Sequence, residues 1–176
     1  YILFVGTIEP RKNIEVLMRA YGRLEDNIKD EYQLLIVGRF GWKYAHIFKF
    51  CHKLRLSSDQ LKFLGYVSNQ DLTNLYCGAS LFVFPSLYEG FGITLLEAMK
   101  FRVPVLCSDI PVFREVAGQG AFFVDPKNVE SMRDGIKKIL VDKQINAHLM
   151  NRGLEQYKLY SWKKSAQELL RIFNSW

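Results

Sequence analysis

Short, uninterrupted runs of apolar residues recur along this chain and limit its fold more than any other feature. The clear runs cover residues 2–5, 34–37, 81–84, 103–107 and 121–124, and a weaker one covers 61–64. Strands of a parallel sheet have this composition because helices cover both faces of the sheet. None of the runs approaches the roughly 20 residues that a membrane span requires. The sequence therefore predicts a buried, mostly parallel β-sheet.

Segments with helical spacing separate these runs. Apolar side chains fall at i, i+3, i+4 and i+7 in two of them, at Ile14, Leu17, Met18 and Tyr21 and at Tyr44, Ile47, Phe48 and Cys51. The stretches 92–101 and 111–117 also lie between two apolar runs. Strand and helix therefore alternate over residues 1–126, which predicts a doubly wound α/β sheet.

Residues 127–176 contain no further apolar run and favour a helical tail. Helices are expected at about 128–140, 143–158 and 161–174, and the last carries an apolar stripe of Trp162, Ala166, Leu169, Leu170 and Phe173. No repeat or low-complexity linker divides the chain, so we predict one domain over residues 1–176. The chain begins in an apolar run without a methionine, and we expect it to be part of a longer protein.

The charge and the cysteines exclude several classes of function. The net charge is +6, but the Lys and Arg residues are scattered and form no basic block, which argues against nucleic-acid binding. Cys51, Cys77 and Cys107 are widely spaced and form no C-x-x-C. We therefore expect free thiols in a reducing cytoplasm.

Two loops that follow predicted strands carry the chemistry. Ligands of open α/β sheets bind at the carboxyl ends of the strands, which here are followed by loops 6–13, 38–43, 65–69 and 85–92. In the first loop, Arg11 and Lys12 precede a helix that Asn13 is expected to cap. Backbone N–H groups and the helix dipole favour an anion at such a place, and the two cations suit phosphate oxygens. The alternative is that both are solvated surface cations.

The loop 85–92 leads into a helix that carries a second carboxylate. Gly90 and Gly92 permit close approach of the backbone to a ligand. Glu89 and Glu97 are eight residues apart, and each carboxylate can accept hydrogen bonds from vicinal sugar hydroxyls. Helical geometry places Glu97 roughly 7 Å along the axis from Gly92, so one unit could hold a sugar, a phosphate and a ribose. The alternative is that Glu89 caps the helix and Glu97 faces solvent.

Several motifs are absent from the sequence. There is no complete G-x-G-x-x-G, no G-x-x-x-x-G-K-[ST] and no D-x-D. The first two absences argue against a dinucleotide site and a P-loop, and the third against a diphosphate bridged by a metal. The histidines show no metal-ligand spacing; they are His46, His52 and His148.

The order of the motifs resembles a known family. G-T-I-E-P-R-K-N, F-L-G-Y-V, P-S-L-Y-E-G-F-G-I-T-L-L-E-A-M, V-P-V-L-C-S-D-I-P and V-D-P follow one another between Tyr1 and about Trp162. In this order they resemble the group 1 (family four) retaining glycosyltransferases. The resemblance covers the C-terminal, Rossmann-like half of a GT-B fold. The G-T-x-E-P-R-K-N variant is most similar to mannosyltransferases of surface-polysaccharide assembly.

The resemblance implies a role for each loop. Lys12, helped by an Arg, would hold the donor diphosphate, Glu89 would contact the donor sugar, and Glu97 would bind the ribose hydroxyls. Arg11, Lys12 and Glu89 are thus the expected catalytic residues. The expected donor-binding positions are Gly6, Thr7, Gly38, Arg39, Gly65, Tyr66, Val67, Glu89, Gly90, Phe91, Gly92, Ile93, Thr94 and Glu97. The base would lie near 38–39 and 65–67. Many relatives have G-R at Gly6-Thr7, so we infer that Arg11 replaces the missing arginine.

The resemblance also implies the reaction and its partners. It implies a retaining hexosyl transfer, without cofactor or metal, from a GDP-, UDP- or ADP-sugar to a glycan or lipid-linked acceptor. The acceptor site would belong to an N-terminal domain absent from this chain, so the fragment alone should transfer poorly. The expected location is the cytoplasm, with loose attachment to the inner membrane face allowed. Two alternatives stay open: a non-catalytic nucleotide-sugar-binding module, and a GT-B relative that performs phosphorolysis or epimerisation.

Overall fold

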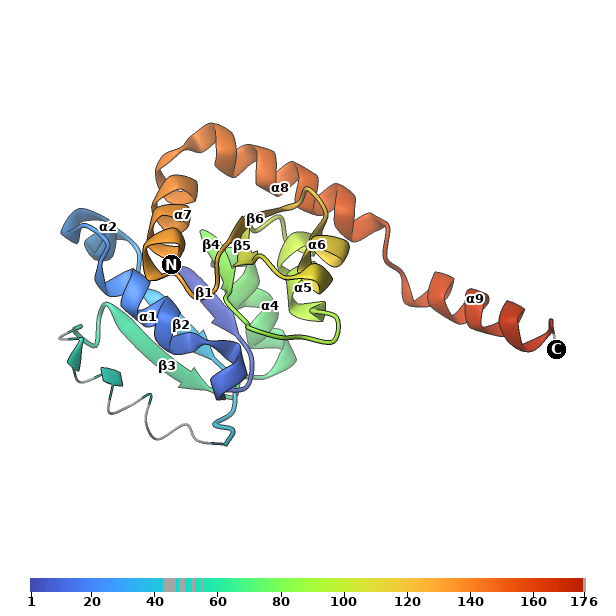
Figure 1. The fold of residues 1–176 in the computed structure, drawn as a ribbon, viewed down its shortest axis with the longest axis horizontal. Helices are drawn as coiled ribbons and strands as arrows, with labels where there is room; N and C mark the ends of the chain where they lie inside the picture. The colour runs from blue at the N-terminus through green and yellow to red at the C-terminus, as the bar shows by residue number, and fades with distance from the viewer. Residues whose placement is uncertain (43–46, 48–49, 52, 55, 176) are drawn as a thin grey trace.

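A computed structural model shows six parallel strands in one sheet (Figure 1). The structure describes every residue except 43–46, 48–49, 52, 55 and 176. The strands are β1 (Ile2–Val5), β2 (Leu34–Val37), β3 (Leu61–Gly65), β4 (Leu81–Phe84), β5 (Val105–Ser108) and β6 (Ala121–Val124), in the order β3-β2-β1-β4-β5-β6. All neighbouring pairs are parallel. The predicted doubly wound α/β fold is confirmed.

The apolar runs became strands because the sheet is covered on both faces. Every residue of β1, β2, β4 and β5 is buried. The predicted run 103–107 forms a strand only from Val105, since Pro104 has no N–H to donate to a ladder. β3 lies at the edge of the sheet, where exposed residues alternate with buried or half-buried ones, which explains its weaker apolar pattern.

Helices occupy most of the remaining chain. They are η1 (Pro10–Lys12), α1 (Ile14–Gly22), α2 (Asp26–Glu31), α4 (Asn69–Gly78), α5 (Ile93–Lys100), α6 (Pro111–Ala117), α7 (Val129–Val141), α8 (Lys143–Lys158) and α9 (Trp162–Phe173). α1 packs against α7, and α5 packs against α8. The three predicted tail helices are confirmed as α7, α8 and α9. The helix predicted over 44–51 falls largely outside the described residues and stays a prediction.

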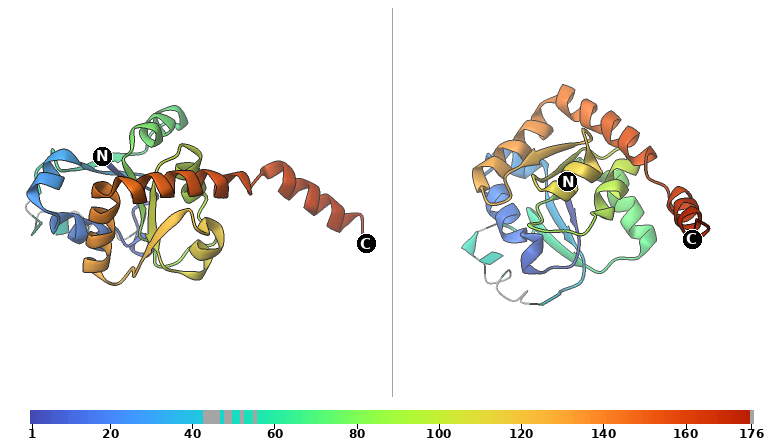
Figure 2. Two further views of the ribbon diagram at one scale, coloured as in Figure 1. Left: turned by 90° about the horizontal axis from the view of Figure 1, so that it is seen from above. Right: turned by 45° about the vertical axis from the view of Figure 1, so that its right-hand side comes forward.

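The last helix projects away from the rest of the domain (Figures 1 and 2). No residue of α9 is buried. Its predicted apolar stripe is exposed, with Trp162 83%, Leu170 61% and Phe173 69% accessible. Among the described helices, none is long and apolar enough to cross a membrane.

The strand order brings two of the predicted loops together. β1 and β4 are neighbours at the centre of the sheet, and the chain leaves them toward opposite edges, which is a topological switch point. Leu87 N donates to Arg11 O at 2.8 Å, so loops 6–13 and 85–92 are joined through their backbones. The fold therefore places the two loops that carry the chemistry at one position on the carboxyl edge of the sheet.

Candidate active site

Two cations and two carboxylates form a connected group where these loops meet. Lys12 Nζ lies 2.5 Å from Glu89 Oε1, and Arg11 NH1 lies 2.7 Å from Glu89 Oε2. Arg11 Nε also lies 2.6 Å from Glu9 Oε1. Glu89 therefore bridges the two cations, and the two positive and two negative charges of the group add up to a formal charge of zero. We call Glu9, Arg11, Lys12 and Glu89 the charge cluster.

The charge cluster is largely removed from solvent. The side chains of Lys12 and Glu89 are 9% and 10% exposed, whereas that of Arg11 is 42% exposed. The Lys12 ammonium also lies 4.7 Å from the centre of the Phe84 ring, so its charge faces an aromatic surface. Lys12 is thus no solvated surface cation, and neither cation is without a partner. The alternative of two solvated surface cations is therefore wrong for Lys12, whereas Arg11 lies at the surface and is paired there with Glu9 and Glu89.

The cations set the protonation of Glu89. Burial disfavours the charged form of its carboxyl, but hydrogen bonds from Lys12 and Arg11 outweigh burial and hold its pKa below the ordinary value. Glu89 is therefore ionised at neutral pH. The α5 N-cap is Gly92, and no side chain caps that helix, so the alternative that Glu89 is a cap is wrong.

Asn13 fastens the loop instead of capping a helix with its side chain. It occupies the N-cap position of α1, but its side chain makes no capping hydrogen bond. Its Nδ2 donates to Pro85 O at 3.0 Å and to Pro126 O at 2.7 Å. The expected N-cap position of Asn13 is confirmed, and its side chain ties loop 6–13 to the chain after β4 and after β6.

Glu97 lies half-buried in the second turn of α5, beside a tyrosine from another helix. Tyr76 Oη on α4 donates to Glu97 Oε2 at 3.0 Å. The alternative of a glutamate that simply faces solvent is wrong. Tyr76 was not identified from the sequence, because α4 was not predicted. One signal was present: Ser68 caps α4 and accepts from Asp71 N, an S-x-x-D pattern before Leu72.

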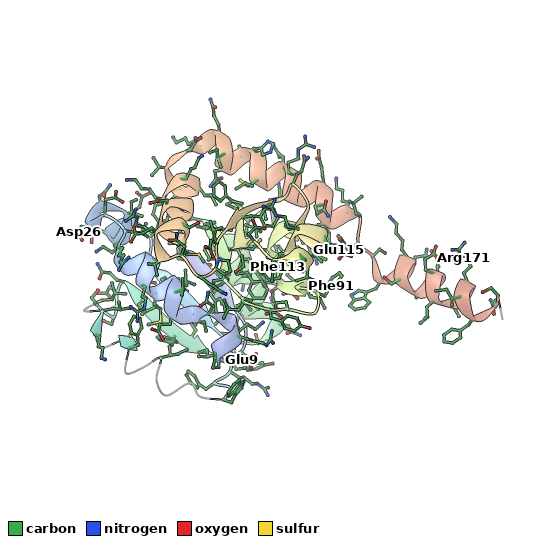
Figure 3. All side chains as sticks on the ribbon, in the orientation of Figure 1. Glu9, Asp26, Phe91, Phe113, Glu115 and Arg171 are labelled. Carbon is green, nitrogen blue, oxygen red and sulfur yellow. The ribbon has the colours of Figure 1, made fainter. Side chains whose placement is uncertain are left out.

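The start of α5 leaves room next to the charge cluster. Gly92 has φ 99°, and a Cβ there would lie 2.9 Å from the Phe113 ring, so the position requires glycine. Gly90 is different, because a Cβ there would meet nothing within 4 Å. Thr94 Oγ1 is buried and has no hydrogen-bond partner in the part of the chain that the structure describes. Phe91 and Ile93 are 43% and 50% exposed. Phe91 and Phe113 are among the side chains labelled in Figure 3.

The other predicted donor-binding positions meet at the ends of β1, β2 and β3. Gly38 N donates to Gly65 O at 2.8 Å, and the Arg39 guanidinium lies 4.5 Å from the centre of the Tyr66 ring, which is 66% exposed. A Cβ on Gly38 would lie 2.0 Å from Gly6 O, so close packing of two loops already accounts for this glycine. Thr7 is exposed and Val67 half-buried. These positions therefore follow the carboxyl ends of β1, β2 and β3, on the same edge of the sheet as the charge cluster.

The metal-binding residue types do not gather in the described part of the chain. There, no group of three or more His, Cys, Asp or Glu side chains could hold a metal ion. Cys51, Cys77 and Cys107 are free, as predicted. His148 is exposed on α8, and His46 and His52 lie outside the described residues.

Known proteins resemble this chain over most of its length. The family model of the group 1 glycosyl transferases matches residues 1–156. The chain is 36% identical over 173 residues to O-antigen chain mannosyltransferase B of Escherichia coli, covering 98% of this chain and 45% of that protein. It is 39% identical over 140 residues to O-antigen chain mannosyltransferase RfbU of Salmonella typhimurium, covering 79% of this chain and 38% of that protein. The chain thus spans less than half the length of these relatives.

Solved structures share the fold. Sucrose-phosphate synthase from Thermosynechococcus elongatus superimposes with a TM-score of 0.87 at 26% identity, covering 99% of this chain and 44% of that one. The Anabaena protein HepE, solved in complex with UDP, superimposes with a TM-score of 0.88 at 19% identity. That match covers 100% of this chain and 49% of HepE, and at this identity it concerns the fold alone.

Proposed function

The chain belongs to the group 1 glycosyl transferases, and from that premise we propose that it is the donor-binding half of a retaining hexosyltransferase that uses no metal. The donor would be a nucleoside-diphosphate sugar. The observation that carries the proposal is the bridge from Lys12 and Arg11 to Glu89 at the switch point of the sheet. Lys12 is buried and already pairs with an anionic group, which supports a role in holding the phosphate of a donor.

We propose that the donor diphosphate takes the place that Glu89 occupies between the cations. A phosphate oxygen offers Lys12 and Arg11 the same charge-assisted hydrogen bonds that the carboxylate now makes. Glu89 would then turn toward the donor sugar and accept hydrogen bonds from its hydroxyls. The open space at Gly90 leaves room for this exchange. Lys12 and Arg11 would keep an anionic partner after binding, whereas Glu89 would exchange its two cations for the hydroxyls of the sugar.

The same cations would stabilise the leaving group. When the bond between sugar C1 and the phosphate oxygen breaks, the electron pair stays on the diphosphate and its negative charge grows. Lys12 and Arg11 are already in place to meet that charge, which lowers the barrier without reorganisation. An acceptor hydroxyl would attack C1 from the face that the phosphate leaves and pass its proton to the departing phosphate oxygen, which retains the anomeric configuration. The acceptor would be bound by an N-terminal half outside this chain.

The nucleoside end of the donor would lie along the other strand ends. Glu97 would accept hydrogen bonds from the ribose hydroxyls, and the base would lie near Arg39 and Tyr66, whose stacked pair is exposed. The relatives at 36% and 39% identity are named O-antigen chain mannosyltransferases, so we propose mannose as the transferred sugar. The acceptor would be a growing glycan or a lipid-linked one.

Replacement of Lys12 tests this function directly. In the full-length protein, Lys12→Ala should weaken binding of GDP, UDP or ADP by about ten- to a hundredfold, since a hydrogen bond to a charged group contributes about 1.5–3 kcal/mol. Binding of the corresponding nucleoside should hardly change. Arg11→Ala should have a smaller effect in the same direction, because its side chain is more exposed. Calorimetry with each nucleotide and nucleoside measures both affinities.

Lys138→Ala on α7 is the matched control, because Lys138 Nζ also lies over an aromatic ring, 5.7 Å from the centre of Phe122. It should leave both affinities unchanged. Equal affinity of Lys12→Ala and the parent for the diphosphate would overturn the proposal. Assays of the parent with labelled nucleotide sugars and acceptor then separate transfer from phosphorolysis, epimerisation and mere binding.

A further inference from the structure

The ring of Tyr76 is fixed inside the domain by aromatic neighbours. The residue is 1% exposed. Its ring stacks on Phe101, with centroids 5.8 Å apart and planes at 11°, and it meets Phe82 at 5.8 Å and 58°. These contacts leave the hydroxyl a single direction, toward α5. The Tyr76 side chain is therefore fixed in place and presents its hydroxyl from α4 to α5.

The Tyr76 hydroxyl reaches Glu97 and donates a hydrogen bond to its carboxylate. Tyr76 Oη lies 3.0 Å from Glu97 Oε2. Burial, and after it the negative charge of Glu97, raise the pKa of Tyr76 far above its ordinary value, so the phenol is protonated at neutral pH. The Tyr76 hydroxyl is therefore a hydrogen-bond donor to Glu97 under the conditions of a binding assay at neutral pH.

One half of the Glu97 carboxylate remains available. Among the residues that the structure describes, Glu97 Oε2 accepts from Tyr76, whereas no hydrogen bond to Oε1 is found. A glutamate on a helix surface normally samples several side-chain rotamers. An anchor on Oε2 restricts these rotamers and leaves Oε1, with the second lone pair of Oε2, as fixed acceptors. This is the arrangement that two neighbouring hydroxyl donors require.

We propose that Tyr76 is a positioning residue that orients the Glu97 carboxylate for the ribose hydroxyls of the donor, a role that rests on the proposed function. It does not touch the ligand itself. Its contribution is to hold Glu97 in the binding rotamer before the ligand arrives, so that binding does not have to order the side chain.

A double-mutant cycle tests this role in the full-length protein. The probes are the tightest-binding member of GDP, UDP and ADP and its 2′,3′-dideoxy form. Tyr76→Phe keeps the stacked ring and removes only the hydroxyl, and should weaken binding of the ribose form roughly three- to tenfold. Binding of the dideoxy form should be unchanged. When Glu97 is already glutamine, Tyr76→Phe should cost little more for either ligand.

Tyr21→Phe is the control for the loss of a buried tyrosine hydroxyl. Tyr21 is fully buried, and its hydroxyl donates to Tyr32 O at 2.9 Å, away from the predicted donor-binding positions. It should lower the melting temperature without changing the preference for ribose. If Tyr76→Phe weakens both ligands equally, as a purely structural residue would, the inference is overturned. If Glu97→Gln itself fails to distinguish ribose from dideoxyribose, the ribose assignment in the proposed function falls too.

Discussion

The substitution Glu89→Gln should strengthen the binding of nucleoside diphosphates while it lowers the free energy of unfolding. The charge cluster is neutral in the structure, because two cations face the carboxylates of Glu9 and Glu89. Glu89→Gln removes one negative charge and leaves a formal charge of +1. An incoming diphosphate then no longer has to displace a carboxylate from Lys12, nor to bind close to one.

The size of the effect follows from the geometry. A phosphate that contacts Lys12 and Arg11 would lie roughly 5 Å from a Glu89 carboxylate that has moved aside, where one pair of unit charges at an effective dielectric constant of about 20 interacts by about 3 kcal/mol. Solvent around the exposed Arg11 reduces this. We expect the affinity for the diphosphate to rise by about 1–2 kcal/mol, roughly five- to thirtyfold. Stability should fall by about 1–3 kcal/mol, because the buried Lys12 loses its charged partner.

The assay compares a nucleoside diphosphate with the matching nucleotide sugar by calorimetry in the parent and in Glu89→Gln. The diphosphate should gain affinity, but the nucleotide sugar should gain less, since the sugar loses its carboxylate acceptor. Glu115→Gln removes the same charge on α6, where Glu115 is exposed and lies apart from Glu9 in the view of Figure 3, and should change neither affinity. A loss of diphosphate affinity in Glu89→Gln would refute the exchange between carboxylate and phosphate.

Two further predictions concern metal and pH. Binding of the diphosphate should be unchanged by EDTA, because Lys12 and Arg11 supply the positive charge. Calorimetry with and without the chelator measures this, and a loss of binding in EDTA would contradict the prediction. The pKa of Glu89 is lowered by folding, so the stability that it provides is complete above the ordinary carboxyl value of about 4.3 and is lost as the pH falls through the folded value. The difference in unfolding free energy between the parent and Glu89→Gln should therefore be constant from pH 8 to about pH 6 and decrease at more acidic pH. A difference that already decreases between pH 8 and pH 6 would refute the lowered pKa of Glu89.

The sheet was predictable because strands that are buried on both faces consist of consecutive apolar residues. Runs such as 34–37 and 81–84 contain no polar residue that could face water, and each became a buried strand. The missed helices lack this kind of signal. α2 consists of D-N-I-K-D-E with Ile28 as its single buried residue, and α4 buries only Tyr76. Both helices have too few fully buried side chains to give a periodic apolar pattern in the sequence.

The sequence singled out most of the residues that gather at the switch point, but it did not indicate their contacts. Arg11, Lys12, Glu89 and Glu97 came from loops next to strand ends and from the resemblance. The contact between Lys12 and Glu89 joins residues 77 positions apart, and periodicity says nothing about such a pair. The strand order alone would have supplied it, because a switch point between β1 and β4 places the loops after them together. The ion pair between Glu9 and Arg11 depends on the 3-10 turn η1 between them, and no sequence pattern indicated that turn.

The carboxylates of Glu89 and Glu97 have different hydrogen-bond partners, and under the proposed function this difference gives them different roles. Glu89 is held by two cations, so it can turn to a ligand only when another anion takes its place. Glu97 is held by the neutral hydroxyl of Tyr76, which leaves acceptor capacity on its carboxylate without any exchange. We therefore expect that a ribose would bind at Glu97 without any exchange of partners, whereas Glu89 would engage the sugar only once a phosphate has replaced it between the cations. Under the proposed function, this order ties sugar recognition to the presence of the leaving group that the reaction needs.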